Sequence, residues 1–385
     1  MTTLDIKSPT RVLFGAGQIV ALGEIAAALG AKRALVVSDP GIERVGHTQR
    51  GIESLQIAGL ETHIFDGLQE NPTTDHVDAG LAVAKDFQPD LLIAIGGGSS
   101  MDCAKGINFL YCCGGRMQDY WGVGKATADL IPMIAVPTTA GTGSEAQSFA
   151  LISDAETRVK MACGDKRAAF HTAVLDPQLT VTQPPRVAAL SGFDALSHAV
   201  ETYVTTKRNQ DSCRYSLEAW QRLAPNFLVV LSEPNDIVAR GQMQLGACLA
   251  GLAIENSMLG AAHALANPLT AIYGIAHGEA VALMLPHVVR LNGTRHDNWY
   301  QELLASSADE PNSPTDCPQG GATELADFLR QIASAAGLPA RLQECGVDRA
   351  ELPQLAEDAA GQWTASFNPI SVSSTKLLRL YELAY

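Results

Sequence analysis

The first half of the chain alternates short β-branched runs with segments of helical periodicity, and this alternation constrains the fold more than any other feature. Four runs, RALVVSDPG, ETHIFDG, DLLIAIGGGSS and IPMIAVPTT, are dense in Val, Ile and Leu. Intervening segments such as QIVALGEIAAALG and TTDHVDAGLAVAKDF place apolar residues three and four positions apart. Strands that alternate with helices predict parallel βαβ units, with helices on both faces of a sheet.

The character of the sequence changes near Leu175. A Pro-rich passage, DPQLTVTQPPRVAALSG, is followed by Ala- and Leu-rich segments with few strand signals. A chain of 385 residues is also longer than one hydrophobic core usually grows. We therefore expect an α/β domain over residues 1–176 and an all-helical domain over residues 177–385. Residues 306–322 are rich in Pro, Gly and Asp and predict an exposed loop.

The composition favours a small-molecule ligand. The formal net charge is -14, and no basic cluster occurs anywhere, which argues against nucleic acid or an anionic membrane surface as a partner. The eight cysteines are scattered and include no CxxC pair, so we expect reduced thiols in a cytoplasm.

Neither an export signal nor a membrane span is expected. The start, MTTLDIKSPTRVLFG, lacks the basic and apolar regions of a signal peptide. The apolar region 245–266 is interrupted by Glu255, Asn256 and His263, so it predicts a buried helix rather than a membrane span. We expect a soluble cytoplasmic protein.

A glycine-rich turn follows the third of the four runs. In DLLIAIGGGSSMDCAKG, a buried strand breaks into three glycines and two serines and then resumes as a helix. Glycines let backbone N–H groups approach a phosphate, and the following helix offers its positive end. An ordinary tight strand-to-helix turn would have the same pattern. Both interpretations stay open on this turn alone.

Two further strand ends strengthen the phosphate interpretation. The next strand ends in PTTAGTGSE, which supplies hydroxyl donors at Thr138, Thr139 and Thr142. The first run ends in VVSDPG, where Asp39 could accept bonds from a ribose and repel a 2′-phosphate, favouring NAD over NADP. Asp39 could equally cap a helix that starts at Pro40. No GxGxxG follows the first strand, so the ordinary Rossmann arrangement is not expected.

Four residues in the second half have the chemistry of a metal site. In SGFDALSHAVE, Asp194 and His198 are four positions apart and project from one helix face. An Asp–His hydrogen bond on a helix surface is the alternative. In AAHALANPLTAIYGIAHGE, Pro268 and Gly274 predict a helix end, a loop and a new helix start between His263 and His277. One carboxylate and three imidazoles suit Fe(II) or Zn(II).

These stretches together carry a family resemblance. From about Arg11 to the C-terminus, the chain resembles the iron-containing (group III) alcohol dehydrogenases through GGGSSMD, PTTAGTGSE, FDALSHAVE, GAAHALANP and YGIAHGEAVALMLPH. The resemblance implies a Rossmann-like dinucleotide-binding domain and an all-helical domain, with metal and substrate in a cleft between them.

The resemblance also implies roles for individual residues. The metal ligands fall on Asp194, His198, His263 and His277. The dinucleotide contacts fall on Asp39, Asn71, Gly97, Gly98, Ser99, Asp102, Thr138, Thr139, Thr142 and Lys160.

Two positions depart from the family pattern. Asn267 stands where the family often has a second histidine, so a direct proton relay at that position is in doubt, because an amide accepts no proton near neutral pH. Ile370 stands where an arginine commonly follows Asn-Pro. We therefore expect a subfamily with its own substrate, held in an apolar pocket with contributions from Phe149, Ile254 and Asn267.

The resulting hypothesis is an NAD-dependent, Fe(II)-dependent alcohol dehydrogenase that interconverts a small alcohol and its aldehyde or ketone, working as a homodimer or higher homo-oligomer. The ion would act as a Lewis acid on the substrate oxygen while hydride passes to NAD. The proton would leave through water, the ribose hydroxyls or His287.

Alternatives are a hydroxyacid-oxoacid transhydrogenase, a maleylacetate-type reductase, and a lyase of the dehydroquinate synthase kind. The non-enzyme alternative is a helical protein with a structural metal.

Overall fold

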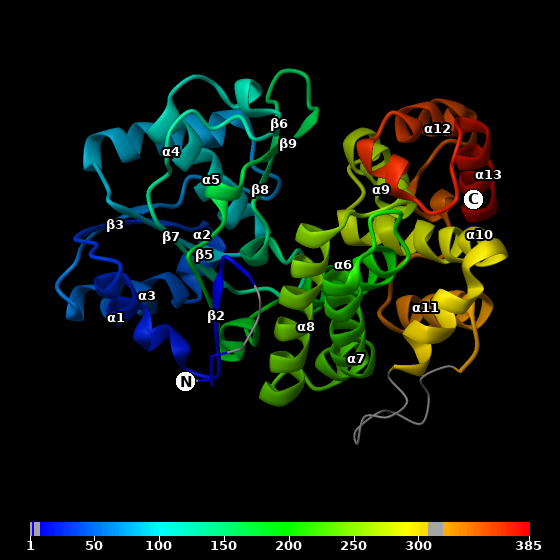
Figure 1. Ribbon diagram of the computed structural model, residues 1–385, viewed down its shortest axis with the longest axis horizontal. Coiled ribbons are helices and arrows are strands. Elements are labelled where there is room, and N and C mark those ends of the chain that lie inside the picture. Colours follow the sequence, from blue (N-terminus) through cyan, green and yellow to red (C-terminus); the bar gives the residue numbers. More distant parts are fainter. Residues whose placement is uncertain (1, 4–7, 307–318) are drawn as a thin grey trace. The chain divides into compact units, whose positions relative to one another are not determined.

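The computed structural model describes residues 2–3, 8–306 and 319–385. The chain divides into two compact units, which we call the first and the second unit (Figure 1). The first unit comprises Met1–Thr139 and Gly143–Gln183, and the second comprises Ala140–Thr142 and Pro184–Tyr385. The loop expected at residues 306–322 falls largely outside the described residues.

The first unit contains a seven-stranded sheet in the order β1-β2-β10-β7-β5-β3-β4. Only the β1–β2 pair is antiparallel, so the predicted parallel sheet is confirmed. All four predicted runs are strands of this sheet, whereas β2 and β10 were not predicted. The strands are β1 Thr2–Thr3, β2 Arg11–Phe14, β3 Arg33–Val37, β4 Glu61–Phe65, β5 Leu91–Gly96, β7 Met133–Pro137 and β10 Thr172–Leu175.

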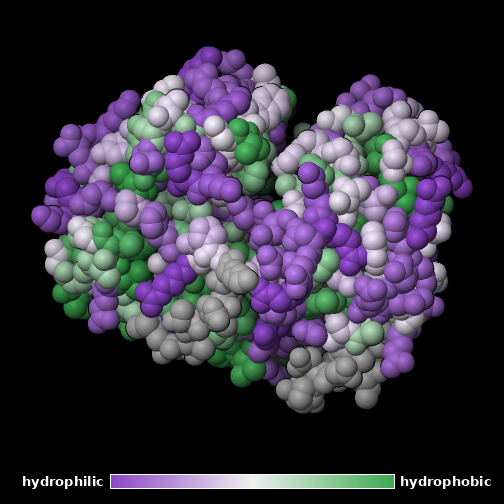
Figure 2. Space-filling model, in the orientation of Figure 1, coloured by the Kyte–Doolittle hydropathy of each residue, from purple (hydrophilic) through white to green (hydrophobic). Residues whose placement is uncertain are grey.

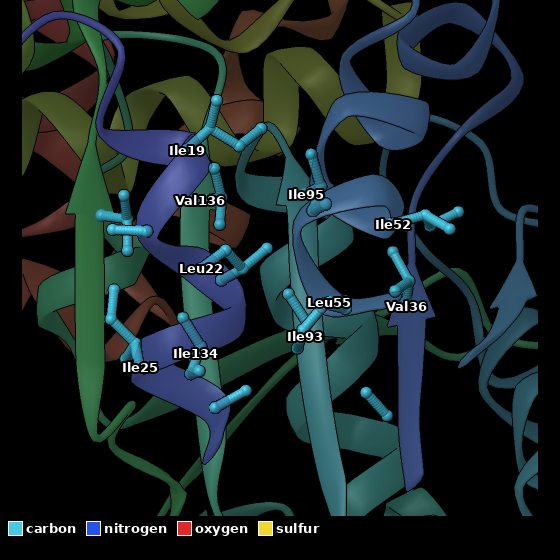
Figure 3. Packing of buried hydrophobic residues seen from close by; sticks show 14 of the residues in the cluster. Ile19, Leu22, Ile25, Val36, Ile52, Leu55, Ile93, Ile95, Ile134 and Val136 are labelled. Atoms are coloured by element: carbon cyan, nitrogen blue, oxygen red, sulfur yellow. The ribbon is translucent and has the colours of Figure 1, made fainter. Parts of the chain in front are cut away.

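One face of this sheet packs against the helices that precede and follow β3. Alternate residues of β3, β5 and β7 share a face, as strand geometry requires, and Val36, Ile93 and Ile134 lie in this layer. Leu22 from α1 and Leu55 from α3 cover them (Figure 3). All are fully buried. The other face packs against α5, which in turn contacts α4. The helices are η1 Gln18–Ala21, α1 Leu22–Ala28, α2 Pro40–Arg44, α3 His47–Ile57, α4 Thr74–Phe87 and α5 Gly98–Cys113.

A second, three-stranded sheet in the first unit was not predicted. Its order is β6-β9-β8, formed by Gly122–Val123, Lys160–Gly164 and Phe149–Ser153. A Cβ atom at Gly164 would lie 2.3 Å from the ring of Phe149, so only glycine lets β8 and β9 approach this closely. Short 3-10 helices complete the unit: η2 Met117–Tyr120, η3 Ser144–Ala146, η4 Lys166–Ala168 and η5 Pro177–Thr180.

The described part of the second unit is helical and contains no strand, as predicted for the second half of the chain. Helices α6, α7 and α8 pack against one another, and α10 contacts both α6 and α9. The helices are α6 Pro185–Tyr203, α7 Gln210–Ser232, α8 Ile237–Asn256, α9 Ala261–Tyr273, α10 His277–Ala305, α11 Ala322–Ala335, η6 Leu342–Cys345, η7 Arg349–Glu351, α12 Leu352–Ala360, η8 Trp363–Phe367 and α13 Ser374–Ala384.

Helix α8 is the one described helix that is long and apolar enough to cross a membrane. Of its apolar window, 83% is buried inside the fold, so it has the burial of a core helix. Figure 2 shows hydrophilic residues over much of the visible surface of both units, with hydrophobic residues in scattered patches.

The expected break between His263 and His277 is only partly correct. Helix α9 ends at Gly274, whose φ of 66° is the left-handed conformation that glycine adopts readily. Pro268, however, lies inside α9 and does not end it. Proline removes one helical hydrogen bond and crowds the carbonyls one turn before it. Tyr381 donates its hydroxyl to the carbonyl of Leu265 at 2.6 Å, so tertiary contacts support the helix where proline weakens it.

Candidate metal and cofactor sites

Helix α6 carries three acidic or imidazole side chains along one face. Asp194, His198 and Glu201 are separated by four and then three positions, and this spacing places them above one another on a helix. All three are buried, with exposed fractions of 5%, 4% and 6%. Burial of this many ionisable groups requires partners, because unpaired charge is costly away from water.

The partners come from α9 and α10 of the same unit (Figure 1). Oδ1 of Asp194 lies 3.3 Å from Nε2 of His198, 3.4 Å from Nε2 of His263 and 3.8 Å from Nε2 of His277. The candidate ligand atoms of Asp194, His263 and His277 all lie within 4.8 Å of one another. His198 is not part of that tightest group, although its ring stacks on His263 with centroids 5.0 Å apart.

The unsatisfied atoms in this cluster fit a bound cation. Asp194 Oδ1 and His263 Nε2, which lie 3.4 Å apart, are both buried without a hydrogen-bond partner. A carboxylate oxygen that faces several imidazole nitrogens can be satisfied by a divalent ion between them, and O/N donor sets of this kind suit Fe(II) or Zn(II). The four predicted ligands are therefore brought together by the fold.

The pKa values show how the protein without an ion would hold protons here. Burial alone would raise the pKa of Asp194, but His198, His263 and His277 hold the pKa of this carboxyl well below its usual range. Burial lowers the pKa of His263, whereas Asp194 and Glu201 raise it, to about 9. Asp194 is thus ionised, and a proton on His263 competes with a metal for the same position.

Glu201 is a residue that sequence reasoning missed. Its Oε2 lies 2.6 Å from Nδ1 of His263, the ring nitrogen opposite the one that faces Asp194. The signal was present in the sequence, since Glu201 is seven positions after Asp194 and three after His198 on the same helix face.

The predicted cofactor residues of the first unit lie mainly at the carboxyl ends of its parallel strands. Asp39 follows β3 and caps α2, because its Oδ1 accepts bonds from the N–H groups of Gly41 and Ile42 at 2.8 and 3.1 Å. The capping interpretation is therefore correct. Its other oxygen, Oδ2, lies 3.6 Å from the position that a Cβ atom would take at Gly96, on the side of the glycine-rich turn.

The glycine-rich turn forms the start of α5. Gly97 is the N-cap residue, and no side chain caps this sixteen-residue helix. The N–H groups of Gly98 and Ser99 thus remain available to an anion, whereas that of Ser100 donates to the carbonyl of Gly97 at 3.1 Å. A Cβ atom at Gly96 would lie 2.2 Å from Oγ of Ser100, so glycine is required there. Ser99 Oγ accepts a bond from the N–H of Asn71 at 3.3 Å, which joins this turn to the loop after β4.

The turn after β7 lies against the glycine-rich turn. The N–H of Thr138 donates to the carbonyl of Gly96 at 2.9 Å, and a Cβ atom at Gly97 would be 3.5 Å from the side chain of Thr139. Thr142 belongs to the second unit. Lys160, at the start of β9, is exposed.

A buried lysine, which sequence reasoning also missed, links α5 to the segment that follows β7. Lys105 is fully buried in α5, and its Nζ donates to the carbonyls of Ser144 and Phe149 at 2.8 Å. Ser144 in turn donates its hydroxyl to Oδ1 of Asp102 at 2.7 Å. Burial raises the pKa of Asp102, while Lys105, Ser144 and Lys160 offset part of this rise.

Comparison with known proteins identifies the chain. Residues 9–177 match the family model described as iron-containing alcohol dehydrogenase, and residues 188–385 match that of the C-terminal part of the Fe-containing alcohol dehydrogenase family. The chain belongs to the iron-containing alcohol dehydrogenase family. It is an oxidoreductase that acts on CH–OH groups, which makes the non-enzyme alternative wrong.

Individual members of this family resemble the chain over nearly its whole length. A 1,3-propanediol dehydrogenase of Klebsiella pneumoniae is 31% identical over 99% of this chain and 98% of its own. An NAD-dependent methanol dehydrogenase of Bacillus methanolicus is 31% identical over 94% of both chains. The crystal structure of a 1,3-propanediol oxidoreductase superposes with a TM-score of 0.92 and 30% identity over 100% of both chains.

The residues suggested for a substrate pocket lie in different parts of this dehydrogenase. Phe149 belongs to the small sheet of the first unit, where its ring lies over Gly164. Ile254 is buried in α8 of the second unit. Asn267 is half-buried in α9, and its amide donates to Oε1 of Gln362 at 3.0 Å.

His287 differs from His198 and His263, the buried histidines of the metal cluster. It is ten positions after His277 on α10, roughly 15 Å along the helix axis. Burial and the charges of Arg330 and Arg290 lower the pKa of His287 to about 4. Nε2 of His287 lies 3.3 Å from the Arg330 guanidinium, so this nitrogen accepts and the ring is neutral. These features argue against a proton relay through His287.

Proposed function

We propose that the protein is an NAD-dependent, Fe(II)-dependent alcohol dehydrogenase that interconverts a small neutral alcohol and its aldehyde or ketone. The observation that carries this proposal is the ring of three imidazole Nε2 atoms within 3.8 Å of a single buried carboxylate oxygen, Asp194 Oδ1. The matching family and its NAD-dependent methanol dehydrogenase member support the choice of reaction and cofactor.

In this proposal Asp194, His198, His263 and His277 hold the divalent ion. When bound, the ion supplies Lewis acidity toward the substrate oxygen. The protein's own contribution is the balance of charge: one carboxylate and three neutral imidazoles offset only half of a divalent charge. Burial of Asp194, His198 and His263 keeps this charge out of water, where it would be screened.

The first unit is proposed to bind NAD at the carboxyl edge of its sheet. The uncapped start of α5 would take the pyrophosphate, because its free N–H groups and the helix dipole both favour an anion. One oxygen of Asp39 caps α2, and the other is proposed to accept a hydrogen bond from a ribose hydroxyl. The contacts proposed within the first unit are Asp39, Asn71, Gly97, Gly98, Ser99, Asp102, Thr138, Thr139 and Lys160, and the family resemblance adds Thr142.

The proposed setting is the cytoplasm, with the enzyme working as a homodimer or higher homo-oligomer. The described cysteines are all free thiols, as expected in a reducing compartment. The net charge of -14 favours neither nucleic acid nor a membrane surface as a partner.

The test is a substrate screen with the purified protein. A chelator removes metal, Fe(II), Zn(II) or Mn(II) is restored separately, and small alcohols and aldehydes are offered with NAD(H) or NADP(H). We expect turnover of neutral primary alcohols with NAD and the highest rate with Fe(II). Turnover only of hydroxy acids or oxo acids would instead support the transhydrogenase or maleylacetate-type alternative.

A further inference from the structure

Glu201 joins α6 to the start of α9 through both of its carboxylate oxygens. Oε1 accepts the N–H of Ala262 at 2.7 Å, and Oε2 accepts Nδ1–H of His263 at 2.6 Å. The N-cap residue of α9 is Gly260, which has no side chain to cap the helix. A Cβ atom at Gly260 would lie only 3.0 Å from Glu201 Oε1, so the glycine makes room for the carboxylate.

The contact with His263 determines which ring nitrogen carries the proton. An ionised carboxylate only accepts hydrogen bonds, so the Nδ1 atom that faces Glu201 must be the donor. In the neutral ring Nε2 then has no hydrogen and presents its lone pair. This Nε2 atom is the one that lies 3.4 Å from Asp194 Oδ1 and has no hydrogen-bond partner.

His198 offers a contrast within the same cluster. Its Nε2 also faces Asp194, but its Nδ1 is buried without a hydrogen-bond partner. In His198, the ring nitrogen that points away from Asp194 has no hydrogen-bond partner. In His263, the corresponding nitrogen is bound to Glu201. The contact with a carboxylate thus distinguishes His263 from His198.

The surroundings of Glu201 suit a buried carboxylate. Besides its two hydrogen-bond donors, it lines a cavity of about 10 Å³ together with Asn292, Tyr300 and Asn368. A cavity of this size has room for about one water molecule. Asn368 and Asn292 exchange amide hydrogen bonds at 2.8 and 2.9 Å, which fixes polar side chains beside the carboxylate.

We infer that Glu201 is a positioning residue of the metal site, which holds His263 in the Nδ1–H form and so directs the lone pair of Nε2 at the ion. The inference rests on the proposed metal ligands of the preceding section. A carboxylate behind a histidine ligand fixes the ring and increases its basicity, and its loss weakens metal binding by about 10- to 100-fold.

The variant Glu201→Gln separates this role from a purely structural one. Ala262 N–H and His263 Nδ1–H are both donors, and a carboxylate satisfies both, whereas an amide has only one acceptor oxygen. We expect the dissociation constant for Zn(II), measured by chelator competition, to rise about 10- to 100-fold. NADH binding, measured by fluorescence, is expected to stay unchanged.

Glu324→Gln is the matched control. Glu324 accepts the N–H of Gly321 at 2.8 Å and caps the start of α11, but it touches no histidine. This variant should bind Zn(II) as the unaltered protein does. An equal loss of Zn(II) affinity in both variants, or no loss in Glu201→Gln, would overturn the inference.

A measurement on the unaltered protein keeps the test independent of folding defects. In the ¹⁵N spectrum of the Zn(II)-loaded protein, Nδ1 of His263 should carry a proton and Nε2 should bind the ion. A deprotonated Nδ1, or an Nδ1-bound ion, contradicts the assignment. Because neither readout needs turnover, an absence of dehydrogenase activity would count against the proposed function and leave this inference standing.

Discussion

The candidate metal cluster of the second unit and the proposed cofactor edge of the first unit offer different parts of the chain to a ligand. The cluster consists of charged or imidazole side chains, and it leaves Asp194 Oδ1 and His263 Nε2 buried without hydrogen bonds. The edge presents backbone N–H groups at the start of α5, framed by glycines and small hydroxyl residues. The first arrangement suits a small cation, and the second suits an extended anion.

This difference has a consequence for mutation. A ligand held by side chains is lost when one side chain is removed, whereas a ligand held by backbone is lost when a side chain is added. The two regions should therefore respond to opposite kinds of substitution, and each should leave the other ligand in place.

The largest effect is expected from removal of an imidazole. In His263→Ala, one nitrogen ligand and the Glu201 contact are both lost. We expect the metal content to fall to a small fraction of one equivalent by elemental analysis. Activity should fall by about 1000-fold or more, because metal-assisted charge stabilisation supplies several kcal/mol. NADH binding is the control, and retention of a full metal equivalent would show that His263 is not a ligand.

The opposite substitution tests the cofactor edge. In Gly97→Val the added Cβ atom meets Thr139 only at an ordinary 3.5 Å, so the fold should tolerate it. The branched side chain would nevertheless cover the start of α5. We expect NADH to bind roughly 30- to 100-fold more weakly, as for the loss of a hydrogen bond to a charged group. Metal content should not change, and unaltered NADH affinity would exclude a phosphate site at this turn.

His287 provides a contrast with the histidines of the proposed metal site. Burial, together with the charges of Arg330 and Arg290, lowers the pKa of His287 from its ordinary value of 6.5 to about 4. The unfolded chain therefore binds a proton at higher pH than the folded one, and stability present above pH 6.5 is lost as the pH falls toward 4.

We expect this histidine alone to contribute on the order of 2 kcal/mol to that loss, measured by urea unfolding across the pH range. His287→Gln removes the titrating group and should flatten the pH dependence between 6.5 and 4. An unchanged slope in the variant would mean that His287 is accessible to protons in the folded protein.

The sequence revealed those parts of the fold that depend on local pattern. Runs such as Leu91–Gly96 are buried on both faces, and their continuous apolar character identified them as strands. Strands β2 and β10 are only four residues long, too short to stand out from their surroundings. Pro268 predicted a helix end where tertiary packing keeps α9 intact.

The residues of the candidate site also include some that the sequence revealed and some that it did not. Residue type and family resemblance are enough to suggest the four proposed metal ligands, because neither depends on contacts between distant segments. Glu201 and Lys105 were missed because their roles depend on contacts across the fold, with His263 and with the carbonyls of Ser144 and Phe149. A charged residue in a helical pattern is usually solvated, and burial distinguishes these two. For Glu201, the spacing from Asp194 and His198 was the one signal in the sequence.

The smallest effect is expected at Asp39, where capping and cofactor choice overlap. Asp39→Asn keeps an oxygen that can cap α2 but removes the negative charge, so stability should stay within about 0.5 kcal/mol. Loss of the charge should relieve repulsion of a 2′-phosphate and raise the NADP to NAD ratio of kcat/KM by about 10-fold. Asp39→Ala, which loses the cap as well, should be destabilised by about 1 kcal/mol and show the same change in ratio. If the ratio moves only in Asp39→Ala, the carboxylate acts on cofactor choice through the shape of the α2 turn rather than through its charge.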